Sequence, residues 1–354
     1  LLMKENFDYV FLTNTPSFYK VNLCRALAKR GLKGLVVFYG FGREAVNVEP
    51  DNLPNLFFHF LHTGNSARRS RWATWRALLK LMKSIETSTV IYSGWLATEY
   101  NLYSFLSPRR RNVVVVESTP FESTTTGLKS RLKRLIVRRM GRALPSGQLS
   151  LELLKRLGFK GRAELTGSVG LIDMPSRPEF SRRYELSQPL RCLYVGRLEE
   201  VKNLEWLIMQ FAKSGRQLTI VGDGSLRARL EKIATPNITF TGFIPNSQLN
   251  DIYLTHDLLV LPSLSEPWGL VVEEALYRGL PVLASDVVGS TPEMINATGA
   301  GMTFQLNNAD DFESSIARIE QNYATFAEAA TQIDFLARAT AQINAWQSVI
   351  SSQQ

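Results

Sequence analysis

The chain has 354 residues, of which 45% are apolar and 21% charged, and no apolar run approaches the ~18 residues of a membrane-spanning helix. This composition argues against a fibrous, disordered or membrane-spanning protein, and the length predicts two domains. Cys24 and Cys192 have no metal-type spacing, so we expect two buried thiols in a reducing compartment, and we expect no signal peptide.

The charge is divided unevenly along the chain. Residues 1–175 carry 27 Lys and Arg against 12 Asp and Glu, a net charge of +15, whereas the remaining residues carry 14 against 20, a net charge of −6. A basic half joined to an acidic half indicates two domains with different partners. The basic half is expected to meet something anionic, either nucleic acid or an anionic membrane surface.

Alternating strand and helix patterns fill the first half. Strands are expected over residues 8–15, 32–40, 88–94 and 112–118, with a helix over residues 20–31 that Gly31 closes. Residues 173–187 contain Pro175 and Pro178 among mixed charges and predict a linker.

The second half starts the alternation again. The expected strands are 190–198, 217–224, 238–243, 257–263 and 280–286, and the expected helices are 201–215, 225–234, 247–255, one from Gly269 and a final pattern over about 325–350. This order predicts parallel sheets wrapped by helices, whose ligands bind where strands end and helices begin.

Three acids surround the helix start in SLSEPWGLVVEEALYRGLPVLASD, residues 263–286. Helical spacing puts Glu273 opposite the apolar face, so we expect a solvated surface acid. Glu274 falls at the edge of that face, where it could pair with Arg278 or hold the hydroxyls of a ligand. Glu266 could be an ordinary acid at a helix start or a ligand-binding group.

The stretch EPWGLVVEE, with Glu266 and Glu274, resembles the E-x7-E motif of retaining GT-B glycosyltransferases, especially the large family four. Residues 262–282 match the family pattern PS-x-x-E-x-[FW]-G-L-x-x-x-E-A-x-x-x-G-x-P-V nearly throughout. VGRLEEVKN, IVGDGSLRARL, FTGFIPNSQLNDIY and HDLLVLPS precede it in the family's order. The resemblance is strong over residues 190–300 and an outline over residues 1–175.

The resemblance implies the GT-B fold, an α/β architecture of two Rossmann-like parallel-sheet domains facing a cleft. The acceptor-side domain would cover residues 1–172 and the nucleotide-sugar donor domain residues 188–334. The C-terminal helix, about 335–354, would cross back to the first domain.

The resemblance also implies roles for individual residues. Arg197 and Lys202 would neutralise the departing diphosphate, Glu266 would contact the donor sugar, and Glu274 would hold the ribose hydroxyls. Salt bridges from Arg197 and Lys202 to neighbouring acids are the structural alternative. The remaining expected donor contacts are Gly196, Phe243, Ile244, Trp268, Gly269, Leu270 and Val271.

The first half departs from the family pattern. Its first loop, TNTPSFYK, lacks the usual glycine pair, and Glu117 with Ser118 stands where many members carry a histidine. We therefore place Ser17, Tyr19 and Glu117 on the acceptor side, although an ordinary turn and a strand-end acid remain open.

The sequence contains no D-x-D metal-binding motif, and His59, His62 and His256 are expected to be structural. Cationic side chains can replace a metal ion at a leaving diphosphate. We therefore expect no metal and no cofactor.

Taken together, the resemblance implies a retaining transferase that moves a hexose from a UDP- or GDP-sugar to a glycan or lipid-linked acceptor in cell-surface polysaccharide synthesis, such as lipopolysaccharide, O-antigen or capsule. The expected chemistry is front-face attack, in which a donor phosphate oxygen takes the acceptor's proton.

Residues 67–83 and 127–142 predict basic amphipathic helices, which indicate a cytoplasmic enzyme bound peripherally to the inner membrane face. Solvated helices packed by their apolar sides are the alternative.

Three other functions compete with this interpretation. A GT-B-fold sugar-nucleotide epimerase would need no acceptor. A nucleic-acid-binding protein would explain the basic half but not Glu266 and Glu274, and no nucleic-acid motif is present, so we expect no such partner. A catalytically silent donor-binding subunit is disfavoured because both glutamates are intact.

Overall fold

The computed structural model describes residues 4–40, 53–62, 69–95, 97–172 and 190–351. The chain divides into two compact units, which are described separately below. Unit 1 contains Leu1–Asp173 and Leu336–Gln354, and unit 2 contains Met174–Phe335. The predicted linker over residues 173–187 lies outside the described residues.

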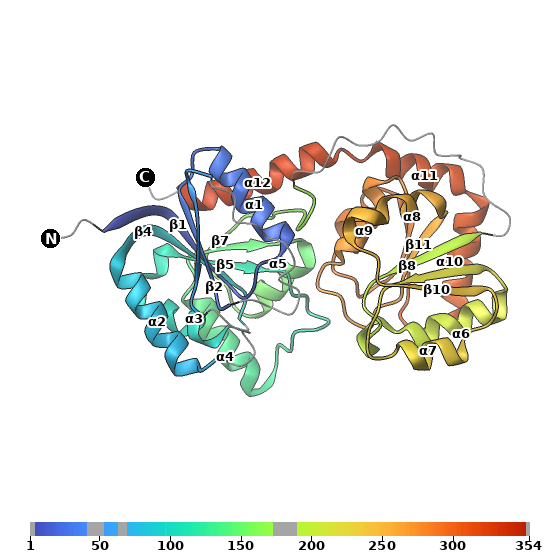
Figure 1. The fold of residues 1–354 in the computed structure, drawn as a ribbon, viewed down its shortest axis with the longest axis horizontal. Helices are drawn as coiled ribbons and strands as arrows, with labels where there is room; N and C mark the ends of the chain where they lie inside the picture. The colour runs from blue at the N-terminus through green and yellow to red at the C-terminus, as the bar shows by residue number, and fades with distance from the viewer. Residues whose placement is uncertain (1–3, 41–52, 63–68, 96, 173–189, 352–354) are drawn as a thin grey trace. The chain divides into compact units, whose positions relative to one another are not determined.

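Unit 1 contains a seven-stranded sheet in the order β3-β2-β1-β4-β5-β6-β7, and all of its pairings are parallel (Figure 1). The strands are β1 Glu5–Thr13, β2 Gly34–Phe38, β3 Leu56–Phe60, β4 Ile85–Ser93, β5 Asn112–Val116, β6 Arg142–Pro145 and β7 Arg162–Ala163. The run NVVVV of β5 suits a strand whose two faces are both covered by helices.

Helices cover both faces of this sheet. They are α1 Phe18–Lys29, α2 Arg71–Ser84, α3 Thr98–Leu106, α4 Gly127–Arg138, α5 Gln148–Arg156 and α12 Phe335–Ser351, with a short 3-10 turn, η2, at Arg109–Arg111. The apolar side chains of α2, α3, α4 and α5 form one core with the sheet, and those of α1 and α12 form a second core on the opposite face. Unit 1 is therefore a three-layer α/β structure.

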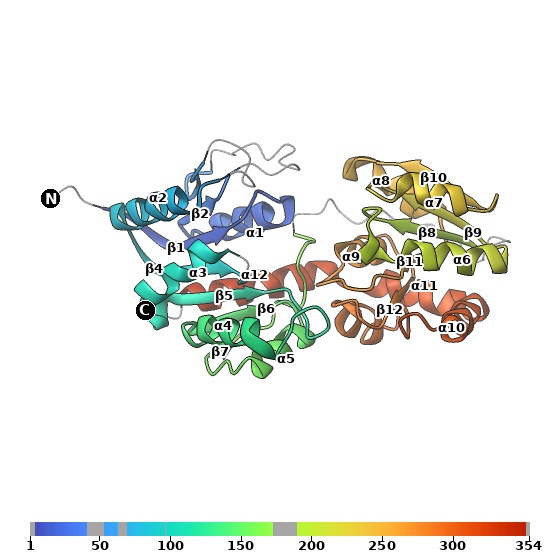
Figure 2. The same cartoon turned by 90° about the horizontal axis from the view of Figure 1, so that it is seen from below.

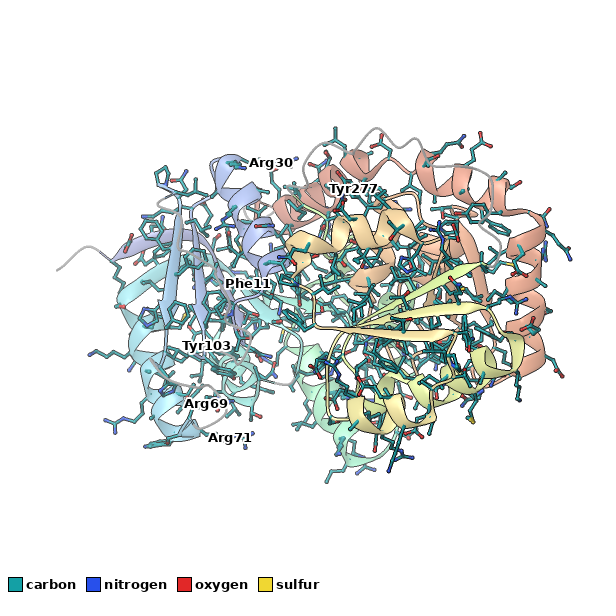
Figure 3. The ribbon with its side chains drawn as sticks, turned by 45° about the vertical axis from the view of Figure 1, so that its right-hand side comes forward. Phe11, Arg30, Arg69, Arg71, Tyr103 and Tyr277 are labelled. Atoms are coloured by element: carbon teal, nitrogen blue, oxygen red, sulfur yellow. The ribbon has the colours of Figure 1, made fainter. Side chains whose placement is uncertain are left out.

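The last helix belongs to unit 1 although it follows unit 2 in the chain. Trp346 is 3% exposed, and its ring meets Phe11 of β1 edge-on with ring centroids 5.3 Å apart; Figure 3 shows Phe11 in the interior. Arg30, at the end of α1, donates to the side chains of Asn344 and Gln347 at 2.6 and 2.9 Å. These contacts confirm that the C-terminal helix returns to the first sheet.

Unit 2 contains a six-stranded sheet in the order β10-β9-β8-β11-β12-β13, again with parallel pairings only, and Figure 2 shows helices on its two sides. The strands are β8 Arg191–Val195, β9 Gln217–Val221, β10 Ile238–Gly242, β11 Leu258–Leu261, β12 Val282–Ser285 and β13 Gly301–Phe304. The helices are α6 Leu204–Ser214, α7 Arg227–Ile233, α8 Leu249–Thr255, α9 Leu270–Tyr277, α10 Ala309–Gln321 and α11 Tyr323–Gln332. Short helical turns are η3 Glu200–Lys202, η4 Asn246–Gln248 and η5 Thr291–Asn296.

The predicted fold class is confirmed, because both halves form parallel sheets wrapped by helices. The helical pattern expected over about 325–350 is divided between two helices, α11 and α12. The other expected strands and helices are present with ends shifted by a few residues; β1, for example, begins at Glu5 rather than at residue 8. Cys24 and Cys192 are both free and buried, as expected. Among the described residues, no helix combines the length and the apolar character that crossing a bilayer requires.

Candidate functional site

The residues expected at the donor follow the carboxyl ends of neighbouring strands in unit 2. Because the strands are parallel, these ends lie along one edge of the sheet. The two central strands, β8 and β11, pair directly although β9 and β10 come between them in the chain, so their loops diverge from the middle of that edge. This is the position at which open parallel sheets bind ligands.

Lys202 and Glu266 meet at this position. Lys202 Nζ donates to Glu266 Oε2, and the two side chains are only 13% and 15% exposed. Ser263 Oγ also donates to Glu266 Oε2, at 3.4 Å. Lys202 thus makes a salt bridge to Glu266 rather than to Glu199 or Glu200, and this pair joins the loop after β8 to the loop after β11.

Backbone hydrogen bonds fix the loop that carries Glu266. The Leu264 N–H donates to the Val201 carbonyl at 2.9 Å, which ties this loop to η3. On the other side, the Gly289 N–H donates to the Glu266 carbonyl at 2.9 Å and the Ser290 N–H donates to the Trp268 carbonyl at 3.1 Å. Glu266 is thus presented from a braced segment rather than from a free loop.

Arg197 is exposed and follows β8 in the same region. The hydroxyl of Tyr194 donates to the Arg197 carbonyl at 3.0 Å. Burial raises the pKa of Tyr194, the charge of Glu266 raises that pKa further, and the charge of Arg197 lowers it. Both charged groups therefore act on this one hydroxyl.

Glu274 is half-buried and faces helix α8. Tyr253 donates its hydroxyl to Glu274 Oε2 at 2.9 Å, and Asn246 Nδ2 donates to Glu274 Oε1 at 3.4 Å. Arg278 donates instead to the backbone carbonyl of Glu274, at 2.9 Å, and to Asn250 Oδ1, at 3.1 Å. The carboxylate of Glu274 is therefore held by neutral donors and not by the helical hydrogen bond that Arg278 makes.

The prediction for Glu273 is wrong. Glu273 is fully buried, and Trp268 Nε1 donates to its Oε1 at 2.6 Å. Helical spacing placed Glu273 away from the apolar stripe, but the indole of Trp268 folds back over this part of the helix and covers it. The spacing of residues within one helix does not show which of its side chains are buried by the loop before it.

The other predicted donor contacts lie along the same edge. Gly269 caps α9 with φ 86°, a left-handed conformation that glycine adopts without strain, and Leu270 and Val271 begin the helix. Gly196 follows β8 directly. Phe243, which is 74% exposed, and the half-buried Ile244 follow β10.

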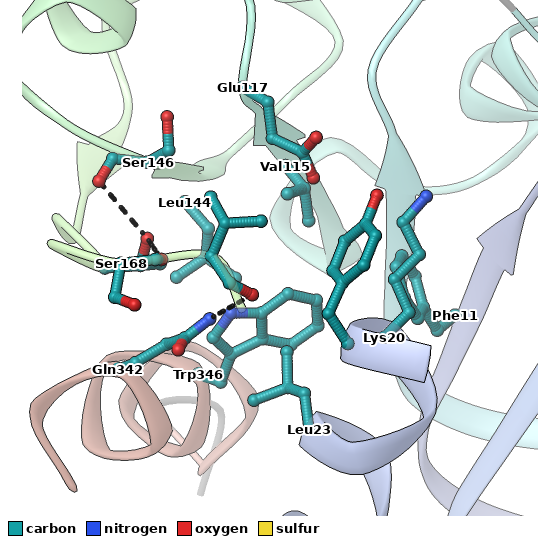
Figure 4. A pocket seen from close by; sticks show the side chains of 13 residues that line it. Phe11, Lys20, Leu23, Val115, Glu117, Leu144, Ser146, Ser168, Gln342 and Trp346 are labelled. Atoms are coloured by element: carbon teal, nitrogen blue, oxygen red, sulfur yellow. Dashed lines mark hydrogen bonds between the residues drawn. The ribbon is translucent and has the colours of Figure 1, made fainter. Parts of the chain in front are cut away.

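The expected acceptor-side residues belong to unit 1 and follow the strand ends of its own sheet. A pocket there is lined by Tyr19 and Glu117, together with Lys20, while Trp346 and Gln342 of α12 form another wall (Figure 4). Ser17 is the N-cap of α1 and is not among the residues that line this pocket. Burial raises the pKa of Tyr19, and the negative charge of Glu117 adds to that rise.

Sequence reasoning missed Lys20. Its ammonium group donates to Thr13 Oγ1 at 3.2 Å and to Ser93 Oγ at 3.4 Å, at the ends of β1 and β4. Burial lowers the pKa of Lys20, and the negative charge of Glu117 partly offsets this effect. The available signal was a lysine in the first turn of a helix that follows a parallel strand.

Two of the three described histidines have hydrogen-bond partners. His62 Nε2 lies 2.7 Å from Thr74 Oγ1, and His256 contacts the Ile252 carbonyl at 2.7 Å and Thr219 Oγ1 at 2.8 Å. Burial lowers the pKa of His59, which lies in β3. Within the described part of the chain, no group of three or more His, Cys, Asp or Glu side chains is arranged to hold a metal ion.

Comparison with solved structures defines the class of fold. A lipopolysaccharide outer core galactosyltransferase in its apo form matches 98% of this chain and 100% of its own, at 14% identity and a TM-score of 0.70. An Anabaena protein solved in complex with UDP and glucose matches 99% of this chain and 98% of its own, at 16% identity and a TM-score of 0.66. The chain has the GT-B fold.

Residues 176–334 match the family model described as "Glycosyl transferases group 1". A sulfoquinovosyl transferase of Arabidopsis thaliana is 37% identical over 139 residues, which are 38% of this chain and 26% of that relative. Curated relatives are matched over only 26% to 38% of their own lengths. The residues that match the family model lie in unit 2, which is therefore similar to the glycosyl transferases group 1 domain.

The half-buried carboxylate of Glu274 predicts a pH-dependent stability. Burial raises the pKa of Glu274, and the hydrogen bond from Tyr253, the charge of Arg278 and the hydrogen bond from Asn246 only partly offset it. An acid whose pKa is raised by folding favours the folded state below its unfolded pKa, and this contribution is lost as the pH rises through the folded pKa. Glu274→Gln removes that dependence.

We expect the melting temperature of Glu274→Gln, relative to that of the unmodified chain, to be highest at neutral pH and to fall as the pH approaches about 4.5. Thermal denaturation followed by circular dichroism across this range measures the difference. Glu328→Gln, at an exposed position of α11, subtracts the general effect of losing one carboxylate from unit 2. A difference that is flat with pH, or that grows on acidification, contradicts the prediction.

Proposed function

We propose that the chain is a retaining, metal-independent glycosyltransferase that moves a sugar from a UDP- or GDP-sugar to a glycan or lipid-linked glycan acceptor in cell-surface polysaccharide synthesis. The observation that carries the proposal is the meeting of Lys202 and Glu266 at the carboxyl edge of β8 and β11, within the segment that matches the glycosyl transferases group 1 model. Two solved neighbours support the substrate class. One is a galactosyltransferase of the lipopolysaccharide outer core, and the other was solved with UDP and glucose.

The donor end of the proposed site combines cations with hydrogen-bond donors. Breaking the sugar–diphosphate bond leaves negative charge on the diphosphate, which fixed positive groups stabilise. In this proposal Arg197 and Lys202 bind the diphosphate, and the N–H groups of Gly269, Leu270 and Val271 add the positive end of α9. Lys202 would exchange its contact with Glu266 for the diphosphate when the donor binds.

The carboxylates would hold the two sugars of the donor. Once Lys202 turns to the diphosphate, Glu266 can accept hydrogen bonds from the hydroxyls of the transferred sugar. Glu274 would bind the ribose hydroxyls, with Tyr253 and Asn246 setting the orientation of its carboxylate. Trp268 is 3% exposed, which makes it part of the packing beneath the loop rather than an open wall for the sugar.

The proposed transfer conserves atoms and charge. The bond between the anomeric carbon and the diphosphate oxygen breaks, and its electron pair leaves with the nucleotide. The acceptor hydroxyl oxygen bonds to the same face of that carbon, and its proton passes to a phosphate oxygen of the leaving group. The chain supplies position and charge, so neither a nucleophilic side chain nor a metal ion is required.

The proposed acceptor contacts lie in the pocket of unit 1. Glu117 offers hydrogen-bond acceptors, while Tyr19 and Lys20 offer donors, a combination that suits hydroxyls, which both donate and accept. Ser17, the N-cap of α1 two residues before Tyr19, is a further proposed acceptor contact.

An anionic membrane is the proposed surface partner, and α4 is the proposed contact. Leu128, Leu132 and Leu135 are 81%, 59% and 49% exposed, and they form one stripe of the helix because they are spaced four and three residues apart. Lys129, Arg131, Arg134 and Arg138 are exposed on the same helix. Exposed leucines with flanking cations suit the interface of an anionic bilayer.

The other basic segment, residues 67–83, contributes less to such a surface. Leu78 and Met82 of α2 are buried in the core of unit 1. Arg69 and Arg71 lie 3.4 and 3.9 Å from the carboxylate of Glu99, which is 3% exposed (Figure 3). Of the bulky apolar side chains of α2, only Trp72, 68% exposed, points clearly to solvent.

The rival functions are not favoured. The named relative and the lipopolysaccharide neighbour are transferases, which argues against the epimerase. A nucleic-acid-binding role leaves the Lys202–Glu266 pair without a purpose.

The proposed donor site predicts binding of a nucleoside diphosphate. UDP or GDP is expected to raise the melting temperature, since ligand at about 100 times its dissociation constant adds about 2.7 kcal/mol to the free energy of unfolding. Lys202→Met is expected to weaken diphosphate binding about tenfold, measured by calorimetry, and to leave the affinity for the bare nucleoside unchanged. Lys213→Met, on the exposed end of α6, is the matched control. The proposal fails if UDP and GDP both leave the melting curve of the unmodified chain unchanged.

The proposed chemistry predicts that catalysis survives removal of metals and preserves the anomeric configuration. The turnover rate in excess EDTA should equal that with added magnesium, because Arg197 and Lys202 supply the positive charge. Proton NMR of the product should give the donor's anomeric configuration. A large loss of rate in EDTA refutes metal independence, and an inverted product refutes retention.

The exposed face of α4 predicts binding to vesicles of anionic phosphatidylglycerol at low salt, and much weaker binding to zwitterionic phosphatidylcholine. The double variant Leu128→Glu, Leu132→Glu is expected to reduce vesicle binding at least about tenfold, since it removes apolar contact and adds repulsion. Leu336→Glu alters a leucine that is 80% exposed on α12 and serves as the control. Co-sedimentation with vesicles measures the binding of the unmodified chain, the double variant and the control. Equal binding of the double variant and the control contradicts the assignment.

A further inference from the structure

A buried hydrogen bond joins the loop that carries Glu266 to helix α9. Trp268 Nε1 donates to Glu273 Oε1 at 2.6 Å, and the two residues are 3% and 0% exposed. The contact spans the start of the helix, because Trp268 precedes the cap Gly269 and Glu273 lies in the first turn. The chemistry proposed above does not use Glu273.

Each of these two side chains depends on the other. An indole N–H can only donate, so a buried tryptophan needs an acceptor. A buried carboxylate is costly unless donors surround it, and a hydrogen bond to an ionised group is stronger than one between neutral groups. Removing either partner leaves a buried polar group without this contact.

The position of Trp268 is transmitted to Glu266 through close packing. A Cβ atom on Gly269 would lie 3.3 Å from Glu266 Cγ and 3.2 Å from Val288, so the turn between loop and helix has little spare room. The carbonyls of Glu266 and Trp268 accept from Gly289 and Ser290 on the same neighbouring segment. A displacement of the Trp268 backbone would therefore also disturb the Gly269 turn, which packs against Glu266.

We infer that Glu273 is a positioning residue, which holds the indole of Trp268 against α9 and thereby fixes the loop that presents Glu266. The purpose of that loop rests on the function proposed above, whereas the coupling between Trp268 and Glu273 does not.

A double-mutant cycle tests the coupling. Glu273→Leu and Trp268→Phe are each expected to lower the melting temperature by about 5 °C, because each removes this buried hydrogen bond from the partner that stays in place. The double variant removes both polar groups, so its loss should be clearly smaller than the sum of the single losses. Glu273→Gln keeps an oxygen acceptor for the indole, so its melting temperature should fall least among the three single variants. Additive losses overturn the inference.

Nucleotide affinity tests the positioning role. Calorimetry should show that the affinity for UDP or GDP is about tenfold lower in Glu273→Leu than in the unmodified chain. In Glu273→Gln most of this affinity should be retained. Asp257→Asn is the matched control, because Asp257 is 5% exposed, pairs with Arg191 and precedes β11 at the opposite edge of the sheet. This control should lower the melting temperature without changing nucleotide affinity. If Glu273→Leu binds nucleotide like the unmodified chain, the positioning role is refuted.

The two failures are distinguishable. An unmodified chain that binds neither UDP nor GDP overturns the proposed function and the positioning role with it. The melting cycle still decides whether Trp268 and Glu273 are coupled. If Glu273→Leu does not fold, Glu273→Gln and Trp268→Phe supply the comparison, and an unchanged melting temperature in Trp268→Phe overturns the coupling.

Discussion

Lys202 and Glu266 come from loops 64 residues apart and neutralise each other in a largely buried position. Two opposite charges that are shielded from water interact strongly, and leaving either one alone there would be costly. The pair therefore holds the loop after β8 against the loop after β11. The other residues of the proposed donor side, including Arg197 and the start of α9, follow the ends of the same two strands.

The same constraint recurs at each acid of the E-x7-E stretch. Glu266 is met by Lys202, Glu273 by the indole of Trp268, and Glu274 by the hydroxyl of Tyr253. Three carboxylates near one helix start are tolerated because each has its own donor and because the helix end attracts negative charge. The partners differ in kind. Glu266 is paired with a cation, which in the proposed function would bind the diphosphate, whereas Glu273 and Glu274 accept hydrogen bonds from neutral donors.

The parallel sheets explain why these residues assemble at all. Parallel strands end along one edge, so residues far apart in the sequence come together there without any local interaction. Unit 1 uses the same geometry for Tyr19, Lys20 and Glu117, which follow β1 and β5. In both units the helices that follow the strands bring their positive ends to the same edge.

From the sequence alone, the alternation of apolar strands and amphipathic helices determined two parallel α/β units, since burial on both sheet faces demands long apolar runs. The order of the motifs determined which strand ends would carry Arg197, Glu266 and Glu274. Only the tertiary structure decided that Glu273 is buried, that Lys202 pairs with Glu266, and that Lys20 enters the pocket of unit 1. Periodicity describes one helix at a time, whereas burial and charge pairing depend on what a distant loop or strand places against it.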